Sequence, residues 1–226
     1  MTVRADEVVF SKRKRLAISV LPGGKVVVRA PLRTSRAMIE RFVNASQDWI
    51  EKAKTRMARL PLPGEVAMRE GEMIWYLGKT YPLHLAPKVK GGLVFEPDKY
   101  FLLQSDQQSR GKQLLKALYR SETRRLASVM VEYYAARSGL KPTSVRINSA
   151  RTRWGSCSMK GGVNFSLRLA MVPISCMEYI VVHELAHLRQ HNHSSAFWEL
   201  VGSILPGYQK ERQWLKQFGL SLPLID

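Results

Sequence analysis

The stretch His-Glu-Leu-Ala-His-Leu-Arg-Gln-His-Asn-His, residues 183–193, is the most informative part of this chain. On an α-helix, His183 and His187 are four residues apart and lie on one face, so both imidazoles can bind one metal ion. Glu184 lies one position round, where its carboxylate can act on a metal-bound water without being a ligand. Three neutral nitrogens and one open position are typical of a catalytic zinc site, whereas a structural site has four protein ligands.

The third ligand has three candidates, and the spacing favours His193. Asn192 tolerates the left-handed conformation common where helices end, so a chain leaving the helix there can bring His193 back to the metal. His191 would continue along the helix, about one turn too far to complete the same coordination sphere. Glu199, in the next helical stretch, is the main rival because a carboxylate from a second helix can also bind zinc.

The limits of this helix can be predicted from its flanks. Ser175 and Glu178 match an S-x-x-E capping box just after Pro173, which indicates a helix start. The apolar residues 180–182 would bury the first turn and make the metal-facing side partly dry. The sequence therefore predicts a helix from about residue 175 to Asn192.

Length and charge limit what kind of protein this is. The 226 residues allow one domain or two small ones, and 45% hydrophobic residues can form a good core. The formal net charge is +18, and residues 1–60 alone carry 14 basic and five acidic side chains. Such a surface attracts polyanions, so nucleic acid bound through the basic surface is an expected partner beside a protein or peptide substrate. No segment reaches the length of a membrane span, so no membrane partner is expected.

The cysteines predict a reducing compartment. Only Cys157 and Cys176 occur, neither in a C-x-x-C pair, and the N-terminus has no apolar signal region. A cytoplasmic location is therefore expected. An alternative enzyme class, a cysteine hydrolase using Cys157 and a histidine, would require a lowered thiol pKa.

The remaining sequence predicts an α+β fold with two regions. Residues 1–105 form a basic N-terminal region with a hairpin, one helix from Thr34 or Ser35 to about Leu60, a linker at 61–64 and a β-meander. Residues 106–226 form the catalytic half, with a long helix, a small antiparallel sheet, the histidine helix and two C-terminal helices. The expected elements are a hairpin of 15–21 and 25–30, meander strands 73–77, 80–85 and 93–103, a long helix 109–138, strands 145–148, 152–157 and 163–167, and helices 195–205 and 207–218.

Several separated motifs resemble the YgjP-like zinc metallopeptidases. The matching stretches follow the family order from about residue 12 to residue 218. They are Val27–Pro31, Trp49-Ile50, Leu77–Lys79 with Tyr81, Arg151–Ser158, Tyr179–His187, Asn192–Ser194 and Phe197-Trp198.

The resemblance implies a zincin-like catalytic half with Zn²⁺ bound by His183, His187 and His193. Glu184 is then the catalytic glutamate, serving as general base in peptide-bond hydrolysis. WLM-type and SprT-like proteases share the spacing, and they act on proteins crosslinked to DNA. Metzincins share it too, but they have a glycine where this chain has Gln190, so the chain is placed outside that clan.

Two further expectations concern the surroundings of the metal. Arg153, Asn164 and Tyr208 are candidates for contact with the substrate or the transition state, although each can also be structural. By analogy with zincins, strand 154–157 or 163–167 would border the substrate. The alternative function is a basic, nucleic-acid-associated zinc protein, either a binding module or a protease acting on DNA- or RNA-bound proteins.

Overall fold

The computed structural model describes residues 4–21, 23–58, 66–219 and 221–225. It divides into two compact units, residues 1–63 and 64–226. The linker predicted at 61–64 and the predicted helix end at Leu60 lie outside the described residues.

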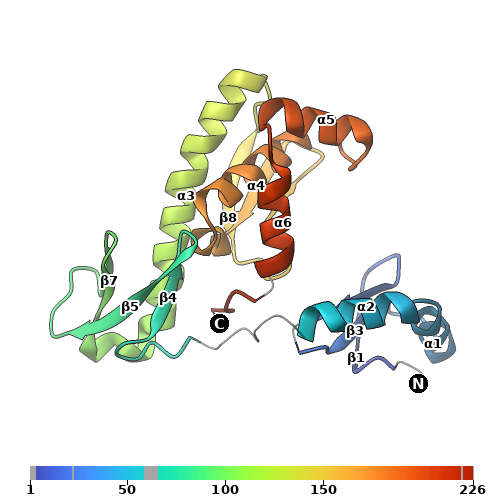
Figure 1. The fold of residues 1–226 in the computed structure, drawn as a ribbon, viewed down its shortest axis with the longest axis horizontal. Coiled ribbons are helices and arrows are strands. Elements are labelled where there is room, and N and C mark those ends of the chain that lie inside the picture. Colours follow the sequence, from blue (N-terminus) through green and yellow to red (C-terminus); the bar gives the residue numbers. More distant parts are fainter. Residues whose placement is uncertain (1–3, 22, 59–65, 220, 226) are drawn as a thin grey trace. The chain divides into compact units, whose positions relative to one another are not determined.

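The first unit combines a three-stranded sheet with two helices (Figure 1). Its elements are β1 (Glu7–Ser11), β2 (Ala17–Val20), β3 (Val26–Pro31), α1 (Arg36–Ala45) and α2 (Gln47–Ala58). The expected hairpin is present as the antiparallel pair β2–β3, and β1 adds parallel to β3. Apolar residues of β3 pack against the helices around Ile39, Val43 and Ile50 in a small core of their own.

The helix predicted from Ser35 to about Leu60 is two helices. Ser35 caps α1, and its hydroxyl accepts from the backbone N–H of Met38. The break falls at Ser46, whose N–H bonds back to Val43 while Ile50 bonds to Ser46. One apolar stripe runs through both helices, so the periodicity alone could not reveal the break.

The second unit begins with a four-stranded sheet of order β4-β5-β7-β6. The strands are β4 (Met73–Tyr76), β5 (Lys79–Ala86), β6 (Leu93–Glu96) and β7 (Tyr100–Gln104). The predicted meander is wrong in one respect, because the segment 93–103 is itself a hairpin whose second strand pairs parallel with β5. Asp98, at positive φ, lies in the turn of that hairpin.

The long helix α3 (Gly111–Ser138) follows a short 3₁₀ turn, η1 (Ser105–Arg110), and ends at Gly139 in the left-handed conformation. Leu83 and Phe101 of the sheet share one core with Leu115 and Tyr119 of α3. The boundary expected after residue 105 therefore lies inside the second unit, since the sheet has no core separate from this helix.

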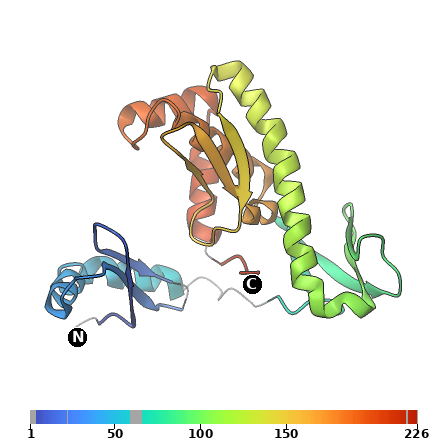
Figure 2. The ribbon, with the colours of Figure 1, turned by 180° about the vertical axis from the view of Figure 1, so that it is seen from behind.

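The second sheet of this unit has the order β8-β10-β9 and lies in the part of the chain that the sequence predicts to be catalytic. It consists of β8 (Ser144–Asn148), β9 (Gly155–Cys157) and β10 (Gly162–Ser166). The sheet is mixed, not purely antiparallel as predicted, since β10 pairs parallel with β8 and antiparallel with β9. In Figure 2, α3 runs along one side of this sheet and the later helices lie behind it.

The later helices complete the unit. They are η2 (Leu167–Met171), α4 (Ile174–Ala186), α5 (Ser195–Ile204) and α6 (Gln209–Phe218). The turn Leu77-Gly78 of the β4–β5 hairpin rests on the residues before α4: Leu77 and Gly78 donate to the carbonyls of Ala170 and Met171. A Cβ at Gly78 would lie 2.7 Å from Pro173, so only glycine permits this approach.

The α+β class predicted from the sequence is confirmed, with a strand-rich N-terminal region and a helical C-terminal part. Among the described residues, no helix combines the length and the apolar character needed to cross a membrane.

Candidate metal centre

Three histidines converge beside the end of α4. One ring nitrogen from each of His183, His187 and His193 lies within 4.8 Å of the other two. His183 is in the last turn of α4, His187 is its C-cap, and His193 lies in the segment leading to α5. The structure thus brings together the three residues that the sequence favoured as ligands.

The limits of α4 differ from the prediction at both ends. The helix starts at Ile174 behind Pro173 with no side-chain cap, and Glu178 instead accepts a hydrogen bond from the hydroxyl of Tyr134. It ends at Ala186, not at Asn192. His187 keeps helical dihedrals (φ −64°, ψ −16°), so the four-residue relation to His183 is preserved although the helix stops there.

In His183 and His187 the Nδ1 atom has a partner within the protein. The Nε2 atom of each ring is therefore available to bind a metal ion. His187 Nδ1 lies 2.9 Å from the carbonyl of Gln190, and His183 Nδ1 lies 3.4 Å from the hydroxyl of Tyr179. The Nε2 atoms of His183 and His193 face each other at 3.1 Å. Nitrogens sharing a tetrahedral zinc stand about 3.3 Å apart, so this donor set fits such an ion.

Aromatic side chains from α5 hold the histidines in place. Phe197 is fully buried, and its ring centroid lies 4.5 Å from that of His187, 4.8 Å from His193 and 4.9 Å from His183. Trp198 stacks on His193 at 5.5 Å. The family resemblance includes Phe197 and Trp198 without giving them a role. Two adjacent aromatic residues, four and five positions after a candidate ligand, are the signal that could have identified them as support for the histidines.

Burial favours the neutral form of His183 and His193. It is the main cause that lowers the pKa of His183 to about 3, and the neighbouring His187, His193 and Arg212 lower it further. The pKa of His193 is lowered for the same reasons, burial first. Neutral imidazoles are the form that binds a metal ion.

Glu184 is buried against β9. Glu184 is only 5% exposed. This burial raises its pKa to about 8, and the positive charge of Arg153 opposes the shift. A Cβ on Gly155, the first residue of β9, would lie 2.5 Å from Glu184 Oε1 and 2.6 Å from Cγ. The carboxylate therefore occupies the space that a side chain at position 155 would need.

The remaining predicted contact residues lie on separate segments of the second unit. Arg153 is exposed, just before β9, and Asn164 is half-buried in β10 opposite Ser156. Tyr208 is buried between two aromatic rings, with Tyr179 at 5.9 Å and Trp198 at 5.7 Å. Both rival ligands, His191 and Glu199, are exposed and outside the histidine cluster.

Cys157 does not suit the cysteine-hydrolase alternative. Burial raises the pKa of its thiol, and the nearby charge of Glu184 raises it further. A nucleophilic cysteine needs the opposite shift, so this environment disfavours the thiolate.

Two known proteins are similar to part of this chain. The curated UTP pyrophosphatase of Escherichia coli (strain K12) is 32% identical over 75 residues, which are 31% of this chain and 45% of that protein. The chain thus matches less than half the length of that relative. The crystal structure of the metallopeptidase zymogen of Pyrococcus abyssi abylysin aligns with 42% of this chain and 98% of its own, at 24% identity and a TM-score of 0.38.

The family comparison covers most of the chain. The model of the YgjP-like metallopeptidase domain matches residues 14–218, which span most of both compact units and include all three clustered histidines. This chain belongs to the YgjP-like metallopeptidase family.

Proposed function

We propose that this protein is a zinc-dependent peptidase that hydrolyses peptide bonds at the centre formed by His183, His187 and His193. The observation that carries the proposal is the convergence of three imidazoles beside one buried carboxylate, Glu184. Three protein nitrogens leave one position open for a water or substrate, as catalysis requires.

The chain's own residues supply the proton transfers. Zinc, when bound, would acidify a water molecule and polarise the substrate carbonyl. Glu184, whose ionised form a bound zinc ion would favour, accepts the proton of that water as the water oxygen bonds to the carbonyl carbon. Glu184 then delivers the proton to the amide nitrogen as the C–N bond breaks, so that a carboxylic acid and an amine leave.

The edge strand β9 is the proposed place for an extended peptide. It is one of the two edge strands of its sheet, and its first residue, Gly155, lies against the side chain of Glu184. A peptide added to this edge would have its carbonyls beside the carboxylate. Arg153 and Asn164 flank this strand and are proposed substrate contacts; Tyr208, buried between two rings, is proposed to support the site from behind.

Zinc removal and restoration test the proposal. The protein loaded with one equivalent of zinc is expected to cleave members of a mixed peptide library. Mass spectrometry identifies the cleavage products. Chelation should abolish cleavage, and zinc should restore it. Cleavage that survives complete zinc removal would contradict the proposal.

Hydrolysis of a nucleoside triphosphate is a second candidate. The E. coli relative is named a UTP pyrophosphatase, and the arginines Arg153 and Arg212 contribute positive charge at Glu184 and His183. Positive side chains stabilise the charge that develops on transferring phosphate groups. Release of pyrophosphate from UTP by the zinc-loaded protein, without peptide cleavage, would favour this candidate.

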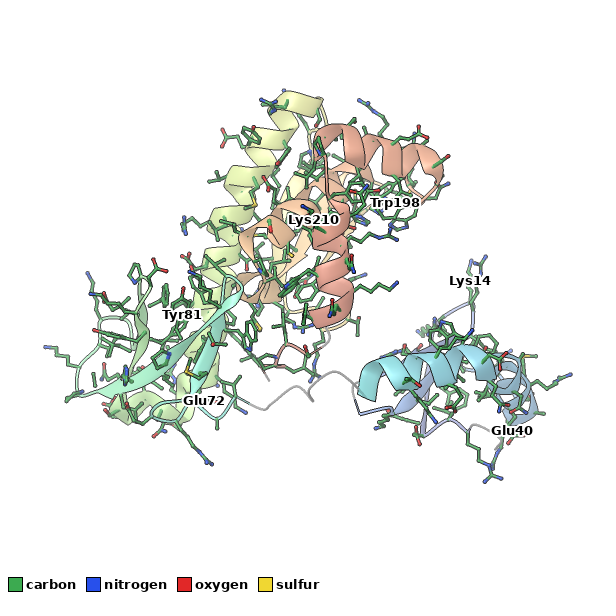
Figure 3. All side chains as sticks on the ribbon, in the orientation of Figure 1. Lys14, Glu40, Glu72, Tyr81, Trp198 and Lys210 are labelled. Atoms are coloured by element: carbon green, nitrogen blue, oxygen red, sulfur yellow. The ribbon has the colours of Figure 1, made fainter. Side chains whose placement is uncertain are left out.

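Nucleic acid is proposed as a partner of the first unit. Lys12, Lys14 and Arg15 are exposed in the loop between β1 and β2, and Figure 3 shows Lys14 projecting from it. Among the described residues, the acidic side chains Glu7, Glu40 and Glu51 pair with other cations, and none pairs with this loop.

The triple substitution Lys12→Ala, Lys14→Ala and Arg15→Ala is expected to weaken binding to a single-stranded RNA at least tenfold at about 50 mM salt, because each cation releases counterions. Gel mobility shifts at two salt concentrations measure it. Removing Lys88, Lys90 and Lys99, exposed residues of the second unit, is the charge-matched control. Absence of any binding by the unaltered protein at about 50 mM salt would rule out this partner.

The proposed location is the cytoplasm. The support is the cysteine usage: the sequence has only Cys157 and Cys176, too few for a disulfide scaffold of the kind that secreted proteins use.

A further inference from the structure

Arg212 is held beside the metal centre by an aromatic ring. Its guanidinium carbon lies 4.2 Å from the centroid of Trp198, within the range of a cation–π contact. The same indole ring stacks on His193 at 5.5 Å and lies 5.9 Å from His183. One side chain therefore separates Arg212 from two of the three clustered histidines.

The position of this guanidinium is fixed by the packing of α4, α5 and α6. Trp198 comes from α5 and lies against α6 (Figure 3), where its ring is nearly parallel to that of Tyr208. Tyr208 and Arg212 are four residues apart at the start of α6 and so share a face. Tyr208 in turn stacks on Tyr179, which lies one turn before His183 on α4. The chain of aromatic contacts thus joins Arg212 to the helix that carries the histidines.

The charge of Arg212 has no counterpart in the described part of the chain. Its side chain is exposed, and no carboxylate described in the structure forms an ion pair with it. A planar guanidinium fixed on an indole, accessible to solvent and lacking an internal anion, is well suited to bind an external one.

We propose that Arg212, stacked on Trp198, binds an anionic group of the substrate beside the metal centre. The ligand chemistry is a planar or tetrahedral oxyanion held by parallel N–H donors, either a carboxylate of a peptide or a phosphate of a nucleotide. The inference takes the location of the reaction from the proposed function, but it concerns binding and does not require turnover. Arg212 is thus a specificity-determining residue: it selects substrates that carry a negative charge near the bond to be cleaved.

Equilibrium binding of two small probes tests this inference. Inorganic phosphate and N-acetylglycine are titrated separately into the zinc-loaded protein. Binding is measured from the tryptophan fluorescence of the protein and from the NMR chemical shifts of the probe. Arg212→Gln is expected to weaken binding of the preferred probe about tenfold, corresponding to about 1.4 kcal/mol. A loss confined to phosphate identifies the nucleotide source, and a loss confined to N-acetylglycine identifies the peptide carboxylate. N-acetylglycinamide, which lacks the charge, should bind no better to the unaltered protein than to the variant.

Two variants separate recognition from packing. Lys216→Gln removes the same charge from an exposed position one turn further along α6 and should leave both titrations unchanged. Arg212→Met keeps an apolar side chain over Trp198 without the charge, so it should fold and show the same tenfold loss. Equal affinity of both Arg212 variants and the unaltered protein for both probes would overturn the inference. Because no hydrolysis is measured, failure of the peptidase proposal would leave this result unaffected.

Discussion

Glu184→Gln is expected to retain zinc and to lower kcat by about 10²–10⁴-fold, the range for loss of a general base. Glutamine has nearly the shape of glutamate, so the buried space beside Gly155 stays filled and the three histidines keep their positions. The amide cannot accept a proton from water. Zinc content by atomic emission and turnover of a library-derived peptide measure the two effects on one sample. Normal cleavage by this variant would show that the assigned base is wrong.

The matched control is Glu199→Gln, the same exchange at the exposed rival ligand on α5. It should change neither zinc content nor kcat. His187→Ala completes the set, because loss of one of three protein ligands should remove the zinc as well as the activity. If Glu199→Gln lost zinc while His193→Ala kept it, the ligand set would have to be revised to include Glu199.

Gly155→Ala is expected to lower kcat by about 10²-fold or more while zinc remains bound. The added methyl group would lie 2.5 Å from Glu184 Oε1 and 2.6 Å from its Cγ, so the whole end of the side chain must move. A general base displaced by about 1 Å can lose this much activity. Overpacking should also cost about 1–3 kcal/mol of stability, measured by urea denaturation.

Gly202→Ala provides the comparison for this exchange. Its new Cβ would meet only Tyr208 Cε1, at an ordinary 3.6 Å, and alanine favours the helix α5 in which it lies. Its kcat should be unchanged. In an Glu184→Ala background the stability cost of Gly155→Ala should disappear, because the two side chains no longer compete. If Gly155→Ala lowered the stability of the Glu184→Ala protein by the same amount, the clash would not be with the side chain of Glu184.

The ligand geometry could be predicted from the sequence because it depends on local spacing. His183 and His187 share a face through helical periodicity alone, and the structure retains that relation although α4 is shorter than expected. The proximity of His193 was expected for a partly wrong reason. The chain turns away after Ala186, well before Asn192, and the turn is closed by backbone bonds from Leu188, Arg189 and Gln190 to Leu185 and Ala186.

The features that the sequence did not predict depend on contacts between distant segments. Glu178 looked like half of a capping box, but the hydroxyl of Tyr134 on α3 competes for the same carboxylate. The parallel pairing of β5 with β7 requires a crossover that no local pattern encodes. The approach of Gly155 to Glu184 likewise joins residues 29 positions apart, and a glycine in a strand indicates a close neighbour without saying which.

The hydrogen bond between His187 Nδ1 and the carbonyl of Gln190 has a consequence for how this centre tolerates change. The acceptor is a main-chain atom, so any residue that can adopt the same turn supplies it equally well. The histidine's ring orientation is therefore inherited from the path of the backbone and is insensitive to the side chain at position 190. The glycine or glutamine at position 190 can therefore distinguish protease clans, although neither side chain is required to orient the histidine that binds the metal.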